Sequence, residues 1–145
     1  MYASLIFCVC TVLTISLISA DSLEIYPAKQ GDNIVAYAVK ASTMKGFSGF
    51  IELMVGFKLD GTIINYSVLK HAETPGLGTK MDSWFNNDNK QNQCVNGKNP
   101  KTVNMTVSKD GGDIDAITAA TISSRAFLDA IDRAYKTLDK GGKYE

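Results

Sequence analysis

The stretch IELMVGFKLDGTIINYSVL, residues 51–69, decides the fold of this chain. It contains two apolar, β-branched runs, 51–59 and 62–69, joined by Asp60-Gly61, a pair that readily supplies the positive φ angles of a tight hairpin turn. Before the hairpin, residues 33–41 carry apolar side chains at alternate positions, which is the period of a strand with one buried face. Together these runs predict an antiparallel sheet.

The segments after the hairpin are expected to complete the fold. Residues 102–108 alternate apolar and polar side chains and predict another strand, followed by a turn over 109–113. Residues 122–138 place apolar side chains on one stripe at helical spacing, which predicts a helix packed on the sheet, with Gly141-Gly142 just past its end. The expected fold class is therefore α+β: an antiparallel sheet with a packed C-terminal helix in a single domain.

The segments that connect these strands and the helix are predicted from their amino-acid composition. Residues 45–50 hold two glycines and two aromatics and predict a loop whose rings cover either the sheet edge or a ligand, with packing on the sheet as the plainer role. Residues 71–78 contain a proline and two glycines, so we expect a rigid loop there, followed by a short helix near 79–85. Residues 86–100 are rich in Asn, Lys and Gln, which is typical of a solvated excursion without a site.

The N-terminal segment is apolar. Residues 2–20 contain no charged side chain, and at about 1.5 Å per residue a helix of this length just spans a hydrocarbon core of about 30 Å. A cleaved signal peptide ending at Ala20 is the alternative, but the apolar run is longer than a signal core and lacks a basic leader, which favours a transmembrane anchor over 1–20. Residues 21–30 then read as a linker, and 31–145 as the domain. Either alternative sends the domain across the membrane.

The charge balance and the cysteines exclude several classes of protein. Fifteen basic and fifteen acidic residues cancel, so no overall positive field favours nucleic acid. Cys8 and Cys10 lie in the apolar N-terminal run, which leaves Cys94 without a partner and argues against a disulfide framework. No metal site is predicted, because the aspartates of residues 110–115 lack the spaced closing glutamate of a calcium loop.

The segment DAITAAT, residues 115–121, is the best candidate for chemistry. Its small residues let the backbone approach a ligand closely, and the N–H groups at the start of the following helix, reinforced by the helix dipole, favour a phosphate. Judged from the residues alone, a simple N-cap role for Thr118 or Thr121 is the plainer interpretation. The run GLGTKM, residues 76–81, lacks the third glycine of a dinucleotide-binding fingerprint and is rejected as one.

Two motifs of this chain, taken together and in their order along the sequence, resemble those of a known family. HAETPGLGTKM, residues 71–81, and DAITAATISSRA, residues 115–126, look like the two signatures of the FMN-binding domain family. That family includes the G subunit of the Rnf electron-transport complex and the C subunit of the sodium-translocating NADH:quinone reductase. GFSG at residues 46–49 and the spacing of the three blocks are more similar to the Rnf subunit. The resemblance covers about residues 31–138.

The resemblance implies a covalent flavin. In the family, the last threonine of the second motif forms a phosphoester with FMN, which a separate flavin transferase adds from FAD. That residue is Thr121 here, while Ala119 stands where glycine is commoner. Residues 73–78 would line the flavin ring. The cofactor-binding residues expected from the resemblance are Glu73, Thr74, Gly76, Leu77, Gly78, Asp115, Thr118, Ala119, Ala120 and Ser123. No catalytic residue is expected.

The resemblance also implies a cellular role. An Rnf-type subunit relays electrons inside a membrane complex that couples ferredoxin-to-NAD electron transfer to export of sodium ions or protons, and it would not turn over alone. It would cross the bacterial inner membrane once, with its domain on the periplasmic side and the other subunits as partners. The alternatives are a quinone-reductase subunit or a stand-alone FMN carrier. In a different class, the chain is a secreted, cofactor-free binding module whose threonine motif is only a capped helix.

Overall fold

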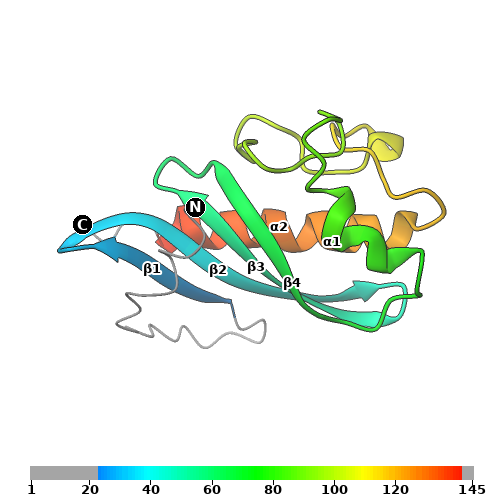
Figure 1. The fold of residues 1–145 in the computed structure, drawn as a ribbon, viewed down its shortest axis with the longest axis horizontal. Coiled ribbons are helices and arrows are strands. Elements are labelled where there is room, and N and C mark those ends of the chain that lie inside the picture. Colours follow the sequence, from blue (N-terminus) through cyan, green and yellow to red (C-terminus); the bar gives the residue numbers. More distant parts are fainter. Residues whose placement is uncertain (1–22, 142–145) are drawn as a thin grey trace.

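The computed structural model describes residues 23–141, which form one sheet backed by one long helix (Figure 1). The four strands are β1 (Glu24–Gln30), β2 (Asn33–Gly46), β3 (Gly49–Lys58) and β4 (Ile63–His71). They pair antiparallel in chain order, β1-β2-β3-β4. The helix α2 (Thr121–Gly141) lies across one face of this sheet. The predicted α+β class and the C-terminal helix are confirmed, and the helix continues as far as Gly141.

The core lies between α2 and one face of the sheet. Along β3 every second side chain is buried and its neighbours are partly exposed, as the two-residue period of a strand requires. α2 supplies the opposite wall, where Phe127 stacks on Phe85 with ring centroids 4.3 Å apart and meets Tyr66 edge-on at 4.9 Å. The buried aliphatic side chains of the sheet include Val39, Ala41, Ile51, Leu53, Val55 and Ile63.

The predicted hairpin is confirmed as β3 and β4. Gly61 has φ +88°, and the backbone N–H of Thr62 donates to Asp60 Oδ1 over 2.9 Å, so the Asp-Gly pair makes the turn. A Cβ atom at Gly61 would lie 2.6 Å from Cε2 of Tyr135 on α2. The glycine is therefore favoured by its backbone angle, and a side chain in its place would have to displace the Tyr135 ring.

The short helix predicted near 79–85 is also confirmed. A 3-10 turn, η1 (Gly78–Lys80), leads into α1 (Met81–Trp84). Met81 is fully buried, and the indole N–H of Trp84 donates to the carbonyl of Asp115 over 2.9 Å. α1 thereby joins the loop after β4 to the segment that precedes α2.

The linker predicted over 21–30 is wrong for most of its length. Residues Glu24–Gln30 form β1, an edge strand paired with β2, and Leu23 and Ile25 pack against the core. Pro27 suggested a loop, but an edge strand tolerates proline because one side of the strand needs no N–H donor. The loop predicted over 45–50 is also shorter than expected, because β2 continues to Gly46 and β3 begins at Gly49.

The strand predicted over 102–108 is wrong. Met105 and Val107 are buried as the alternation required, but Val107 makes only an isolated parallel bridge with Ile114 and the chain then turns through η2 (Ser108–Asp110). The segment 86–100 is irregular as expected, yet it is not simply solvated, because Val95 is fully buried in the core. Alternating apolar residues thus mark burial here without a neighbouring strand to pair with.

Within residues 23–141, no helix is both long enough and apolar enough to cross a bilayer. The apolar segment predicted to be an anchor or signal peptide, 1–20, lies outside the described residues.

Candidate functional site

Three chain segments meet at a pocket of about 320 Å³ at the start of α2. They are the β2–β3 turn, the loop after β4, and residues 119–123, so the two sequence motifs come together although they are far apart in the chain. The pocket mouth is apolar and open to solvent, since Phe47, Leu77 and Ile122 are 66%, 38% and 48% exposed. The lining residues are Phe47, Thr74, Leu77, Gly78, Ala119, Ala120, Thr121, Ile122 and Ser123.

Thr121 is the first residue of α2 and is partly exposed in this pocket. The first N–H groups of a helix have no partner inside it, and the helix dipole adds partial positive charge there, so the position suits an anion. Just before it, Ala119 has φ +62°, the one positive φ among the described non-glycine residues. A left-handed alanine costs about 1–2 kcal/mol. The backbone before Thr121 is therefore held in a strained turn at the pocket wall.

Lys109 brings a positive charge to Thr121, although it lies outside both sequence motifs. Its ammonium donates a long hydrogen bond to the Thr121 hydroxyl, with Nζ 3.5 Å from Oγ1. Lys109 sits in η2, which is bound to α2 by Arg125: the guanidinium donates to both carboxylate oxygens of Asp110, at 2.6 and 2.8 Å. This pair lowers the pKa of Asp110 and raises the pKa of Arg125. No local sequence signal connects position 109 with 121.

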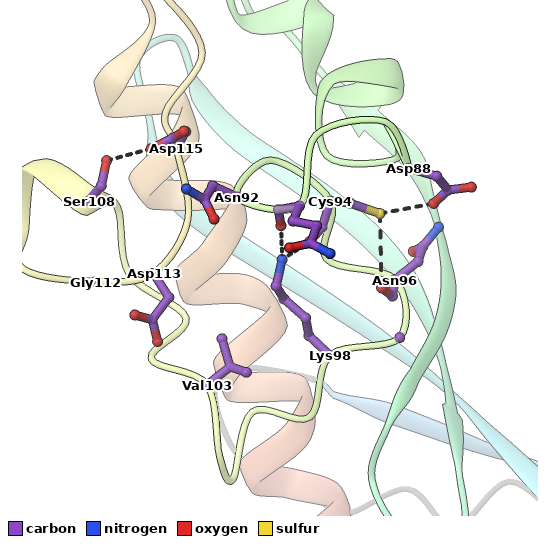
Figure 2. A pocket seen from close by; sticks show the side chains of 12 residues that line it. Asp88, Asn92, Cys94, Asn96, Lys98, Val103, Ser108, Gly112, Asp113 and Asp115 are labelled. Carbon is purple, nitrogen blue, oxygen red and sulfur yellow. Dashed lines mark hydrogen bonds between the residues drawn. The ribbon is translucent and has the colours of Figure 1, made fainter.

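Asp115, which opens the second motif, does not line this pocket. Its Oδ1 accepts the Ser108 hydroxyl over 2.9 Å, its N–H donates to the carbonyl of Asn92 over 2.6 Å, and its carbonyl accepts the Trp84 indole. It faces a second, polar cavity of about 640 Å³ beside residues 88–98 (Figure 2). Asp115 therefore holds the approach to Thr121 in place through neighbouring segments.

Cys94 lines the second cavity, and its thiol and its carbonyl both have hydrogen-bond partners in the protein. The thiol donates to Asp88 Oδ1 over 3.2 Å, and the Lys98 ammonium donates to the Cys94 carbonyl over 2.5 Å and to the Gln91 carbonyl (Figure 2). Burial is the main cause that raises the pKa of the Cys94 thiol. A raised pKa favours the protonated thiol, which is the less reactive form of a cysteine.

Glu73 links the three segments that form the first pocket. It is 4% exposed; its Oε1 accepts the Ser48 N–H over 2.9 Å and its Oε2 accepts the Ser123 hydroxyl. A Cβ atom on Gly46 would lie 2.7 Å from Oε1, and one on Gly78 would lie 2.8 Å from Oε2. Two glycines therefore make room for this carboxylate, which points into the protein and not into the pocket.

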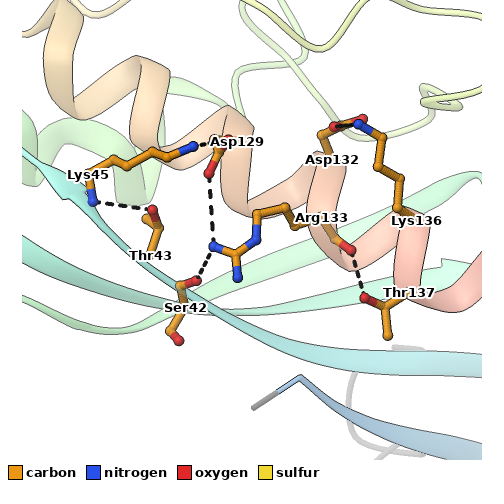
Figure 3. A network of polar contacts seen from close by, with 8 residues as sticks. All are labelled: Ser42, Thr43, Lys45, Asp129, Asp132, Arg133, Lys136 and Thr137. Carbon is orange, nitrogen blue, oxygen red and sulfur yellow. Dashed lines mark hydrogen bonds and ion pairs between the residues drawn. The ribbon is translucent and has the colours of Figure 1, made fainter. Parts of the chain in front are cut away.

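Polar contacts also hold the C-terminal end of β2, next to the β2–β3 turn, against α2 (Figure 3). Lys45 Nζ lies 2.8 Å from Asp129 Oδ1, and Arg133 on the next helical turn donates to the carbonyl of Ser42 over 2.9 Å. Lys45 immediately precedes Gly46 at the end of β2, so this side of the pocket is anchored to the helix that begins with Thr121. Exposed ion pairs contribute only about 0–1 kcal/mol each, so their effect here is mainly to orient the turn.

The structure brings most of the predicted site residues into one pocket and leaves others out. Thr74, Leu77, Gly78, Ala119, Ala120, Thr121 and Ser123 line it. Glu73 and Asp115 support it from behind, as described above, and the exposed residues Gly76 and Thr118 are not among its lining residues. Phe47, Ile122 and Lys109 were not predicted as site residues. Phe47 lies within the GFSG block that carried part of the resemblance, which is a signal that could have identified it.

Comparison with known proteins adds independent findings. The sequence profile described as the FMN-binding domain matches residues 46–136. Similar curated proteins are named as the G subunit of an ion-translocating oxidoreductase complex. One from Erwinia tasmaniensis is 40% identical over 114 residues, covering 76% of this chain and 52% of that protein. One from Escherichia coli K12 is 36% identical over 129 residues, covering 86% of this chain and 61% of that protein. The chain thus spans about half to three fifths of these relatives.

Proposed function

Because the chain belongs to the FMN-binding domain family, we propose that it carries FMN bonded through its phosphate to Thr121. We further propose that it serves as an electron-carrier subunit of a membrane-bound, ion-translocating oxidoreductase of the Rnf type. The observation that carries the proposal is the placing of Thr121: its hydroxyl lies at the start of a long helix, in a pocket whose other walls come from both family motifs.

The residues of the pocket fit the two chemical halves of FMN. The helix start, with Lys109 beside it, suits the phosphate, and the apolar side chains of Phe47, Leu77 and Ile122 suit the flat ring. A volume of about 320 Å³ is at the lower end for ligand pockets. The pocket would therefore enclose part of such a cofactor and leave the rest accessible, which would suit electron exchange with neighbouring redox centres.

The chain's own residues bind and orient, while FMN supplies the electron transfer when it is bound. Thr121 holds the cofactor and stays redox-silent. Leu77 and Phe47 would cover the ring and limit the access of water to it, and Glu73 holds together the segments that carry these side chains. No side chain is required as a general acid or base, so we expect no turnover from this subunit alone.

The cellular setting is part of the same proposal. The names of the relatives support other subunits of an ion-translocating complex as partners. We place the domain on the periplasmic side of a bacterial inner membrane, anchored by residues 1–20, and assign its maturation to a flavin transferase. Ferredoxin-to-NAD electron transfer coupled to export of sodium ions or protons is the expected activity of the whole assembly. The relatives' names favour this assembly over a quinone reductase, and recovery with quinone-reductase subunits alone would contradict it.

Intact mass of the chain tests the covalent flavin. After co-expression with a flavin transferase, the wild-type chain should gain the mass of one FMN phosphoester and fluoresce in a denaturing gel. Thr121→Ala should carry neither signal, whereas the matched variant Thr118→Ala, changed at an exposed residue outside the pocket lining, should keep some label. An unmodified wild-type mass would contradict the proposal and favour the cofactor-free binding module.

A further inference from the structure

We propose that Lys109 is the cation that binds the flavin phosphate at Thr121, so that it assists attachment of the cofactor and then neutralises the phosphodiester. This inference rests on the proposed function and names a residue outside both sequence motifs. Lys109 is exposed, yet its Nζ atom lies 3.5 Å from the Thr121 Oγ1 atom. An oxygen of a phosphate bonded to Oγ1 would lie within reach of the ammonium, at a distance where a charge-assisted hydrogen bond forms.

The backbone around Lys109 is held from two sides, which keeps this residue beside the start of α2. Arg125, on the second turn of α2, donates two hydrogen bonds to Asp110, the residue after Lys109. The hydroxyl of Ser108, the residue before Lys109, donates to Asp115. At the end of η2, Gly111 adopts φ +84°, and a Cβ atom on Gly112 would lie 2.1 Å from the carbonyl oxygen of Thr106. These contacts connect η2 both to the helix and to the first residue of the motif.

Lys109 is also not committed to a carboxylate. Of the other cations near the start of α2, Arg125 is paired with Asp110 and Lys45 with Asp129. Within residues 23–141 no carboxylate forms an ion pair with Lys109. Its charge is therefore uncompensated by the protein and directed at the hydroxyl, which is the arrangement that an incoming phosphate would complete.

The step that Lys109 assists is a phosphoryl transfer with a defined balance. The Thr121 oxygen forms a bond to the FMN phosphorus of FAD, the anhydride P–O bond of FAD breaks, AMP leaves with the electrons of that bond, and the hydroxyl proton is released. The electrons of the flavin ring are not involved. Lys109 remains protonated throughout and interacts with the phosphate oxygens on which negative charge accumulates.

Timed labelling of the full chain with FAD and a flavin transferase tests the inference. Lys109→Gln should slow the initial rate of mass gain about threefold to tenfold, since a charge-assisted contact at an exposed position contributes less than a buried one. Lys109→Arg should restore at least half of the wild-type rate, because it keeps the charge. Lys101→Gln, a matched change at an exposed lysine outside the pocket, should leave the rate unchanged.

The outcomes separate this inference from the proposed function. If the wild-type chain is labelled, Thr121→Ala is not, and Lys109→Gln is labelled at the wild-type rate, the role of Lys109 is wrong and the covalent flavin stands. If Lys109→Gln and Lys109→Arg lose the same amount of labelling, charge is not the cause and the inference is also overturned. If the wild-type chain is not labelled at all, the proposed function itself fails.

Discussion

Replacing Glu73 should loosen the pocket at the start of α2 more than any other single change to a charged side chain at the site. The carboxylate receives one backbone N–H and one hydroxyl while it is 4% exposed. Hydrogen bonds to a charged group contribute about 1.5–3 kcal/mol each, and Glu73→Ala removes two of them and leaves a small cavity. Part of this loss is recovered because the charge no longer has to be buried, so we expect a net cost of about 2–4 kcal/mol.

The more conservative variant Glu73→Gln keeps the shape and one acceptor oxygen. Its amide nitrogen can face the Ser123 hydroxyl, which can rotate to accept, so the cost should be about 1–2 kcal/mol. The control is Glu52→Gln on the open face of the sheet, where the partner is Lys40 at 3.4 Å and the expected cost is about 0.5 kcal/mol.

Urea unfolding followed by circular dichroism measures these differences in the free energy of unfolding. We expect the order Glu73→Ala, then Glu73→Gln, then Glu52→Gln, from most to least destabilised. Amide hydrogen exchange should locate the change, with loss of protection at the Ser48 N–H in Glu73→Ala but not in Glu73→Gln, which keeps the oxygen that accepts from it. A Glu73→Ala variant as stable as Glu52→Gln would refute the linking role of this carboxylate.

Three further predictions concern single side chains. Ala119→Gly should stabilise the fold by about 0.5–1 kcal/mol, because the strain relieved at φ +62° exceeds the cost of the greater freedom that glycine gives the unfolded chain. Ala116→Gly should destabilise the fold, and equal effects of the two changes in thermal melts would contradict this. With FMN attached as proposed, Leu77→Ala should shift the absorbance spectrum of the flavin without preventing its attachment, while Leu59→Ala, exposed outside the pocket, should shift nothing. Tyr66 donates to the Met81 carbonyl over 2.6 Å, and burial raises the pKa of its hydroxyl. The fold therefore favours the protonated phenol, so this stabilisation is complete below about pH 10 and declines as the pH rises further; Tyr66→Phe should cost about 1–3 kcal/mol at pH 7 and flatten that alkaline decline in urea titrations.

Patterns among neighbouring residues predicted the elements whose conformation depends mainly on those neighbours. The Asp60-Gly61 turn and the helical stripe of α2 depend on neighbouring residues, and both were predicted at nearly the observed positions. β1 was missed because Pro27 and Gly31 suggested a loop, and only pairing with β2 makes that stretch a strand. The prediction of a strand over residues 102–108 failed for the opposite reason. The alternating apolar residues are buried, but no strand lies beside them to pair with.

The candidate site divides in the same way. The motifs predicted that residues 73–78 and 115–121 act together, and the pocket contains side chains from both. They could not predict that Glu73 turns inward to Ser123, because the direction of a loop side chain depends on where α2 lies. Lys109 carried no signal, because its relation to Thr121 arises from the return of the chain through Gly111.

The chain's one tryptophan provides a natural optical probe of the site. The indole N–H of Trp84 donates a hydrogen bond to the carbonyl of Asp115, the residue at which the segment that leads to Thr121 starts. Release of that segment would break the bond, admit water to the indole and move its emission to longer wavelength, even while the sheet and α2 remain folded. A red shift that precedes the loss of helical signal during urea titration would therefore time the opening of this segment separately from global unfolding, without any attached dye.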